Sequence, residues 1–187
     1  MKCMKVVLGS LMLALAPLAA LADEMSYSYV DLGYVETDLD GLPSADGFGI
    51  RGSVGFAENW FVFGEYTNQD LEGVDIDQFA VGLGGHYGLT DSMDLTGRFG
   101  YVDAEASAGG FSASVDGYLV SAGLRGAIGD SFELEGRVDY IDLGNAGDDT
   151  SLAVGGRYFF TDAFAVGAEI ASSDDADTYM VGIRWSF

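Results

Sequence analysis

The sequence is poor in the residues that cross-link chains or interrupt regular structure, and it has almost no lysine. Cys3 is the only cysteine, Pro17 and Pro43 are the only prolines, and Lys2 and Lys5 are the only lysines. Eight basic residues stand against 30 acidic ones, which gives the chain a formal charge of −22. A surface of that charge repels phosphate groups, so the composition excludes a nucleic-acid-binding protein.

Residues 1–22 have the layout of a secretory signal peptide. Two lysines near the start precede an apolar run over residues 6–18, and residues 20–22 supply a small-x-small cleavage pattern. The run is shorter than the ~20 apolar residues that a membrane-spanning helix needs. We therefore expect export and removal of this leader, and a mature chain of residues 23–187 that forms one domain.

Loss of the leader removes Cys3 and both lysines. The mature chain then has no cysteine for a disulfide, a metal site or a lipid anchor at the cleavage point. Its six arginines and 30 acids leave a formal charge of −24. High charge with few apolar residues is typical of disorder, but 49% of this chain is hydrophobic. A disordered acidic protein is therefore excluded.

Apolar and polar residues alternate with a period of two through most of the mature chain, as over residues 48–56, 132–140 and 179–187. Alternating segments of ~10 residues separated by turn residues are typical of a membrane barrel. We predict an all-β fold, a transmembrane antiparallel up-and-down β-barrel of about ten strands, with eight strands as the alternative. The predicted strands are residues 26–36, 47–56, 60–69, 77–88, 93–103, 116–128, 132–142, 150–160, 164–172 and 178–187.

The predicted connections alternate between two kinds, as they do at the two ends of such barrels. Tight turns are expected on the periplasmic side, at residues 57–59, 89–92, 129–131 and 161–163. Longer, acidic or Gly-rich loops are expected on the external side, at residues 37–46, 70–76, 104–115, 143–149 and 173–177. Aromatic residues recur at both ends of the segments, and pairs such as Phe48 and Phe56 are eight residues apart. That spacing spans ~20 Å of height in tilted strands, close to the apolar band between two aromatic girdles.

All six mature arginines and seven acids fall on the phase opposite to the bulky apolar residues. Arginine on the lipid face costs ~2–4 kcal/mol at mid-membrane, so we predict that these side chains face the lumen. A soluble lipocalin-like barrel would have the opposite polarity. The predicted lumen charges are Asp31, Arg51, Glu65, Asp94, Arg98, Arg125, Glu133, Glu135, Arg137, Asp139, Arg157, Glu169 and Arg184.

The width of the lumen decides between two functions. Barrels of about eight strands are filled by side chains, whereas 16-stranded porins leave a channel. Ten strands give an intermediate bore, which glycines on the lumen phase such as Gly82 and Gly84 would widen. Inward Phe61, Phe63 and Phe159 would narrow it. We predict a lumen mostly filled by Arg/acid pairs, with a narrow, low-conductance pore for ions or small solutes as the alternative.

These patterns resemble the small outer-membrane barrels typified by OmpX and the transmembrane part of OmpA. The resemblance covers the mature chain and implies a place in the outer membrane among lipid and lipopolysaccharide. The last segment alternates and ends on an aromatic residue, which looks like the C-terminal signal that barrel-assembly machinery recognises. Its residues are Tyr179, Val181, Ile183, Trp185 and Phe187. Those relatives have eight strands, so the strand count departs from them, and we expect no cell-wall-binding domain after Phe187.

The sequence indicates neither catalysis nor a cofactor. His86 is the only histidine and precedes a predicted periplasmic turn, whereas barrel enzymes carry their active groups towards the external end. Ser121 and Ser151 face inward but have no second histidine to activate them. A lumen-facing His86 bonded to a carboxylate or to water is the interpretation we favour.

Acids also gather in the predicted external loops, where Asp38, Asp40 and Asp46 share one loop and Asp70, Glu72 and Asp75 share or flank another. Clustered carboxylates suit Ca²⁺ or Mg²⁺, and such ions would bridge them to lipopolysaccharide phosphates. No segment completes an EF-hand loop. We therefore prefer a solvated acidic surface and keep these six as candidate ligands for divalent cations. The function that fits best is a structural or surface-interaction role in the cell envelope.

Overall fold

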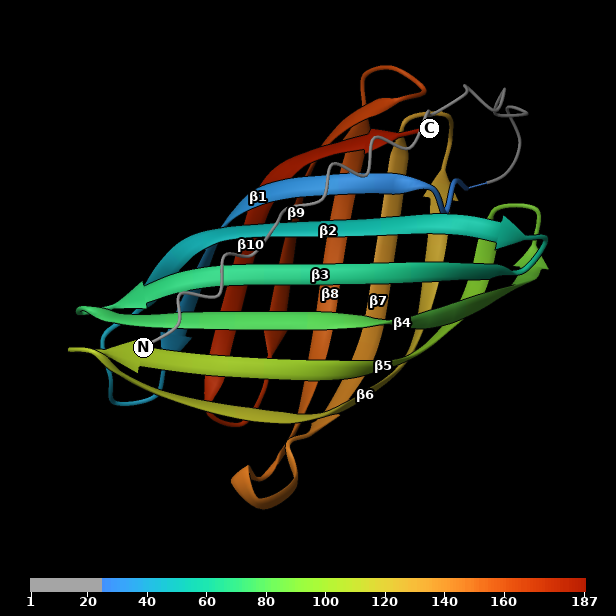
Figure 1. Cartoon of the computed structure of the whole chain (residues 1–187). Coiled ribbons are helices and arrows are strands. Elements are labelled where there is room, and N and C mark those ends of the chain that lie inside the picture. The colour runs from blue at the N-terminus through green and yellow to red at the C-terminus, as the bar shows by residue number, and fades with distance from the viewer. Residues whose placement is uncertain (1–24) are drawn as a thin grey trace, which may run out of the picture.

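The computed structural model describes residues 25–187, which form one closed barrel of ten antiparallel strands (Figure 1). Each strand pairs with its neighbour in sequence, and β1 pairs with β10 to close the sheet. The strands are β1 (Tyr29–Leu39), β2 (Ala45–Ala57), β3 (Trp60–Leu71), β4 (Val74–Thr90), β5 (Met93–Ala108), β6 (Phe111–Ile128), β7 (Phe132–Asp142), β8 (Asp148–Phe159), β9 (Phe164–Ser172) and β10 (Ala176–Ser186). The predicted ten-strand barrel is confirmed, and the leader predicted at residues 1–22 lies outside the described residues.

The two phases of each strand face different surroundings. In β10, Val181 is 63% exposed on the outside, whereas Arg184 is 3% exposed on the inside. The same division holds around the barrel, because successive residues of a strand point to opposite faces of its sheet. The outside is therefore apolar and the inside charged, as the sequence predicts.

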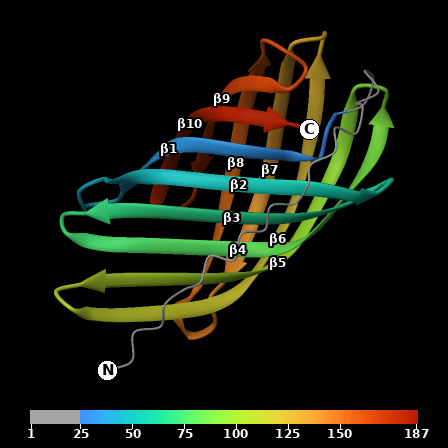
Figure 2. The same cartoon turned by 45° about the horizontal axis from the view of Figure 1, so that its top comes forward.

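The start of β1 and the end of β10 lie at one end of the barrel (Figures 1 and 2), where Tyr29 pairs with Ser186. We call this end the terminal rim; its connections are residues 58–59, 91–92, 129–131 and 160–163. The opposite end, the loop rim, is closed by residues 40–44, 72–73, 109–110, 143–147 and 173–175, and the fourth of these contains a 3-10 turn, Gly144–Ala146. The tight turns predicted from the sequence all fall at the terminal rim.

Most strands extend further towards the loop rim than the sequence-based boundaries predicted, most of all β5 and β6. Residues 104–115 were expected to form a loop, but β5 continues to Ala108 and β6 begins at Phe111. Gly109 and Gly110 have φ values of 57° and 88°, the left-handed conformations that a two-residue hairpin turn requires. Residues 70–76 likewise reduce to a turn at Glu72 and Gly73, with φ values of 51° and 90°. Small Ala and Ser side chains continue the alternation there, but they lack the bulk that marks a strand inside a membrane.

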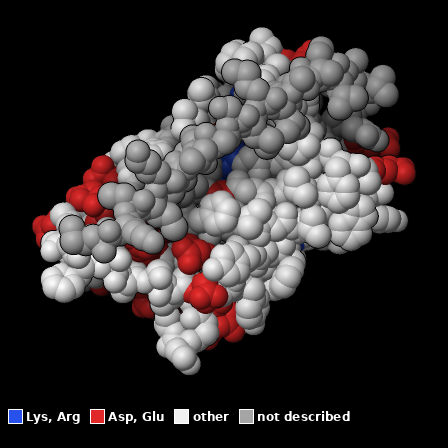
Figure 3. All heavy atoms as spheres, viewed as in Figure 1, with Lys and Arg blue, Asp and Glu red and all other residues white. Residues whose placement is uncertain are grey.

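Charge is distributed unevenly over the outer surface. The face seen in Figure 3 shows acidic side chains, mainly towards the loop rim, and almost no lysine or arginine. Along the sheet, acids lie directly opposite acids: Asp46 pairs with Glu36 on one side and with Asp70 on the other. No helix within residues 25–187 is long and apolar enough to cross a membrane.

Candidate functional site

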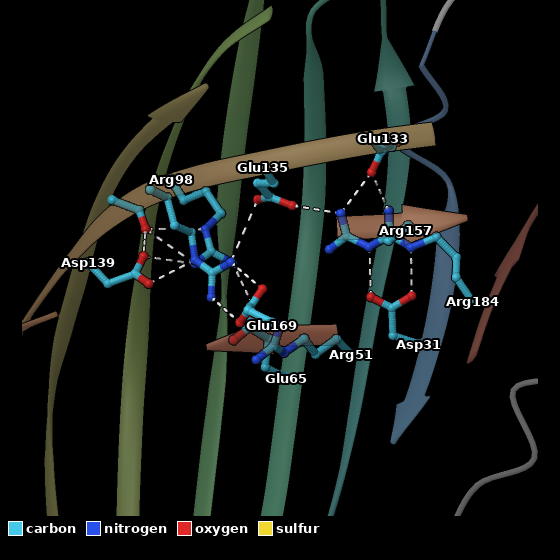
Figure 4. Close-up of polar contacts among 12 residues, drawn as sticks. Asp31, Arg51, Glu65, Arg98, Glu133, Glu135, Asp139, Arg157, Glu169 and Arg184 are labelled. Atoms are coloured by element: carbon cyan, nitrogen blue, oxygen red, sulfur yellow. Dashed lines mark hydrogen bonds and ion pairs between the residues drawn. The ribbon is translucent and has the colours of Figure 1, made fainter. Parts of the chain in front are cut away.

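The lumen holds one continuous network of twelve charged side chains (Figure 4). Every strand except β4 contributes to it, and β7 alone supplies four members because its inward phase is charged from Glu133 to Asp139. The members are Asp31, Arg51, Glu65, Arg98, Arg125, Glu133, Glu135, Arg137, Asp139, Arg157, Glu169 and Arg184. Six arginines balance six acids, which is what burial of charge demands. All six arginines and six of the seven acids that the alternation placed in the lumen are therefore brought together.

Glu133 joins three arginines near the terminal rim. Its carboxylate accepts hydrogen bonds from Arg125 at 2.6 Å, from Arg157 at 2.7 Å and from Arg184 at 3.4 Å. Arg184 also donates two parallel hydrogen bonds, of 2.6 and 2.7 Å, to Asp31 on the adjacent strand β1. Such bidentate pairs hold the planar guanidinium in one orientation. Glu133 thus links four strands, β6, β7, β8 and β10, across the inside of the barrel.

In the second part of the network Arg137 joins several carboxylates, as Glu133 joins several arginines in the first. It donates to both oxygens of Glu169 on β9, at 2.8 and 2.9 Å, and to Asp139 at 2.8 Å. Glu135 lies 3.7 Å away. The pairing with Asp139 and Glu135 follows from their common face on β7, but Glu169 lies two strands away. Arg51 donates to Glu169 from β2 at 2.9 Å, so Glu169 connects opposite walls of the lumen.

Arg98 completes the network on the β5 side. It donates to Glu65 and, at 3.1 Å, to Asp139, while Ser121 donates its hydroxyl hydrogen to the same Asp139 oxygen. The Arg98 guanidinium also lies 5.0 Å from the ring centroid of Phe63. Ser121 therefore helps to position the Asp139 carboxylate.

Tyr27 fills the lumen at the terminal rim. Its ring stacks on His86, with centroids 4.0 Å apart, and on Phe61 at 5.1 Å. Its hydroxyl donates to Asp94 at 2.8 Å, and His86 Nδ1 lies 3.5 Å from the same oxygen. Burial, reinforced by Asp94, raises the pKa of Tyr27 well above its usual range despite the opposing effect of nearby Arg125, so the hydroxyl keeps the proton that it donates. The sequence predicted a lumen-facing His86 bonded to a carboxylate or to water, but it did not single out Tyr27, which precedes β1.

Lumen glycines do not widen the bore, contrary to the expectation from the sequence. A Cβ added to Gly84 would lie 2.1 Å from the Phe61 ring, and one added to Gly82 would lie 2.9 Å from the Phe63 ring. The Phe61 and Phe63 rings of β3 thus pack directly against the backbone of the β4 glycines. Gly123 has the same relation to Arg137, whose Cβ would be 2.7 Å away. The space left by glycines on one strand is occupied by large side chains of the neighbouring strand.

Cavities border the charged network inside the barrel. One, of about 310 Å³, lies between the network and the loop rim, and polar Thr37, Gln69 and Gln78 are among its lining residues. Another, of about 30 Å³, is bordered by Asp31, Arg157 and Arg184. Arg51 borders both, so its side chain stands between them.

The acidic residues of the loop rim do not assemble into a metal centre. Residues 25–187 contain no group of three acid, histidine or cysteine side chains arranged to hold a metal ion. Asp38 instead accepts a hydrogen bond from Ser44 at 2.6 Å, and Asp70 accepts one from the Gly73 N–H at 3.2 Å. Asp40 lies in the first loop-rim connection and Glu72 in the second, while Asp75 pairs with Asp70 across the β3–β4 hairpin.

Four of the five residues of the expected assembly signal lie on the outer phase of β10, and Phe187 follows the end of that strand. Val181 and Ile183 are exposed, as are Tyr179 and Trp185 to a smaller degree. The Phe187 N–H donates to the carbonyl of Ser28 at 3.0 Å, which ties the end of the chain to the start of the barrel.

The family described as outer membrane protein beta-barrel domain matches residues 7–152. The chain belongs to this family. It is therefore an outer-membrane β-barrel, and the apolar outside and charged inside of its wall suit a membrane. No curated protein matches the sequence.

Solved structures of outer-membrane proteins are similar to this barrel at low identity. The NanC porin is 11% identical, with 86% of this chain and 100% of that chain covered and a TM-score of 0.53. Ail, the attachment invasion locus protein of Yersinia pestis, is 19% identical over 88% of this chain and 100% of its own, with a TM-score of 0.43. The N-terminal barrel of Pseudomonas aeruginosa OprF is 10% identical over 87% and 100%, with a TM-score of 0.49.

Proposed function

We propose that this protein is a non-conducting, non-enzymatic barrel with a structural or surface-interaction role in the outer membrane. The observation that carries the proposal is the continuous Arg/acid network together with the Tyr27 stack at the terminal rim. Each of the six arginines has a carboxylate partner, so an ion that entered would have to displace a buried pair. Breaking such pairs costs several kcal/mol, which opposes conduction.

Conductance in a planar lipid bilayer tests the proposal. The wild-type barrel should give no discrete channels. The double variant Tyr27→Ala, Glu133→Ala removes the ring stack and the joint between three arginines, and it should leak. Discrete, stable channels from the wild type would contradict the proposal.

A narrow pore is the second candidate, and the two cavities that meet at Arg51 favour it. If the lumen conducts, Arg51 is the barrier between them, and Arg51→Ala should raise the conductance of an already active wild type. If the lumen is closed, Arg51→Ala alone should remain silent, because Tyr27 and the Glu133 joint still fill the terminal rim. The same bilayer measurement separates the two functions.

We propose two partners for the outer surface of the barrel. The exposed aromatic and aliphatic residues of β10 suit recognition by barrel-assembly machinery, and deletion of Phe187 should reduce the amount of barrel inserted in membranes. The outward acids at the loop rim suit divalent cations shared with lipopolysaccharide phosphates. Calcium should then protect the loop-rim connections from protease more than NaCl of matched ionic strength; equal protection would leave the acids as a solvated surface.

A further inference from the structure

Two residues of opposite charge lie side by side in the cavity of about 310 Å³ and pair with other residues. Arg51 and Glu65 are directly opposite each other in the β2–β3 register, and both line this cavity (Figure 4). Among residues 25–187, the ion-pair partner of Arg51 is Glu169 on β9, and that of Glu65 is Arg98 on β5. Each member of this neighbouring pair is thus held by a residue elsewhere in the barrel.

Both side chains keep hydrogen-bonding groups for the cavity. Arg51 uses Nη1 for its hydrogen bond to Glu169, and a guanidinium has five N–H donors in all. Glu65 accepts from Arg98 with Oε1, and its Oε2 is a second acceptor. The side chains of Arg51 and Glu65 are 19% and 24% exposed, more than any other member of the charged network. A ligand in the cavity can therefore reach a cation and an anion at once.

The same row of the wall continues as an apolar surface. Glu65 lies opposite Ala80 on β4, and Ala80 lies opposite Val102 on β5. Both apolar residues line the cavity, and so do Leu119 and Ile141, which are opposite each other on β6 and β7. Adjacent strands lie ~4.8 Å apart. A guanidinium, a carboxylate and aliphatic groups therefore follow one another at this interval across the wall.

The size and the surrounding charges of the cavity favour a small ligand without net charge. Its volume corresponds to roughly ten water molecules at ~30 Å³ each, which suits a small molecule and excludes a polymer. Asp149 is among the lining residues, and the acids of the loop rim add to its field, so a ligand that is only anionic is repelled. Arg98 and Arg137 line the cavity beside Arg51 and oppose a ligand that is only cationic. A zwitterion avoids both penalties.

We propose that Arg51, Glu65, Ala80 and Val102 form a binding site for a small α-amino acid with an aliphatic side chain. Arg51 binds the carboxylate of the ligand, Glu65 binds its ammonium group, and the aliphatic chain packs on Ala80 and Val102. Guanidinium and carboxylate groups match in geometry as well as in charge. This binding goes beyond the structural or surface role proposed above, and it does not depend on whether the lumen conducts.

Equilibrium dialysis of the full barrel against radiolabelled leucine tests the site. The detergent is non-ionic, because a zwitterionic one carries the same two charges as the ligand. The wild type should bind leucine saturably. As competitors, 4-methylpentanoate lacks the ammonium group, 3-methylbutylamine lacks the carboxylate and glycine lacks the aliphatic chain, and each should bind about tenfold or more weakly than leucine. Equal competition by 4-methylpentanoate would overturn the proposal, and so would the absence of saturable leucine binding.

Two matched variants assign the ammonium site. Glu65→Gln keeps the shape of the side chain but removes its charge, so it should weaken leucine binding about tenfold or more without weakening the binding of 4-methylpentanoate. Glu135→Gln removes the same charge from the network, but Glu135 lines neither of the two cavities described, and this variant should bind leucine as the wild type does. Equal losses in the two variants would overturn the assignment of Glu65. If either variant folds poorly, the competitors decide with the wild type alone.

Discussion

The β7 wall and the β3–β4 wall of the lumen obey the same alternation but fill the interior in different ways. On β7 the inward phase carries Glu133, Glu135, Arg137 and Asp139, all held by ion pairs. On β3 it carries Phe61 and Phe63, whose rings rest on glycines of β4. An apolar ring needs only a matching shape, whereas a buried charge needs a partner of opposite sign in reach.

This difference shows what each wall tolerates. The apolar wall depends on neighbouring residues of complementary size, which can be exchanged in pairs. The charged wall depends on residues up to several strands apart, so one substitution leaves several groups uncompensated. Substitutions in the charged wall are therefore expected to destabilise the barrel more than those in the apolar wall. Only a substitution in the apolar wall should be compensated by one second substitution at a neighbouring residue.

The largest effect is expected for Glu133→Ala on the charged wall. This change leaves Arg125, Arg157 and Arg184 short of a partner, and breaking a buried pair typically costs about 3–5 kcal/mol. Urea unfolding of the barrel in detergent measures the loss. Glu133→Gln keeps the shape and an acceptor but removes the charge, and it should lie between the alanine variant and the wild type. An unchanged unfolding midpoint in Glu133→Ala would show that the charged network does not stabilise the barrel.

The apolar wall is tested by Gly84→Ala. The added methyl group meets the Phe61 ring, and such overpacking costs about 1–3 kcal/mol. In a Phe61→Ala background the conflict disappears, so the same glycine substitution should cost almost nothing. Gly136→Ala is the control, since Gly136 has no atom within 4 Å of the added Cβ, and it should be neutral. Equal costs of Gly84→Ala in both backgrounds would contradict packing of the ring on this glycine.

Tyr27 packs on the β3–β4 wall and donates a hydrogen bond to Asp94 on β5, and the contributions of its ring and its hydroxyl can be separated. Tyr27→Phe keeps the stack on His86 and Phe61 but loses the hydrogen bond to Asp94, which should cost about 1.5 kcal/mol. Tyr27→Ala loses both contacts and should cost more. Thermal unfolding, monitored by circular dichroism, measures the stability of the two variants relative to the wild type. If the phenylalanine and alanine variants unfold together, the ring contributes nothing and the hydroxyl carries the whole effect.

The smallest effect is expected outside the lumen, where charges are not paired. Asp46 lies between Glu36 and Asp70 on the neighbouring strands. A cross-strand pair typically changes the free energy of unfolding by about 0.2–1 kcal/mol, and like charges opposite each other lower it. Asp46→Asn should stabilise the barrel slightly at low ionic strength, with the gain fading as salt screens the acids. Glu133→Ala should keep its effect in salt, because its partners are buried. Asp130→Asn, in a terminal-rim turn, is the control and should show no gain; a salt-independent gain for Asp46→Asn would point to a cause other than repulsion.

Much of the charged lumen follows from the sequence. The period of two places every arginine on one phase, and the cost of arginine in lipid decides that this phase is inside. The pairing of Arg137 with Asp139 is also local, since both lie on one face of β7. Its bidentate pairing with Glu169 and the approach of Arg51 from β2 depend on barrel closure, which no local pattern encodes. The inward turn of Tyr27 has the same origin, because its partners Phe61, His86 and Asp94 lie far along the chain.

The sequence by itself determined the barrel class, the ten strands, the turns of the terminal rim and the phase of each lumen charge. Those features depend on alternation and on the exclusion of charge from lipid, which act on every strand separately. Only the tertiary structure decided which charges meet, which glycines receive Phe61 and Phe63, and how far β5 and β6 project beyond the wall. These depend on distances between strands that closure sets. Outside the membrane, moreover, small side chains continue a strand without the apolar signal that marks it within lipid.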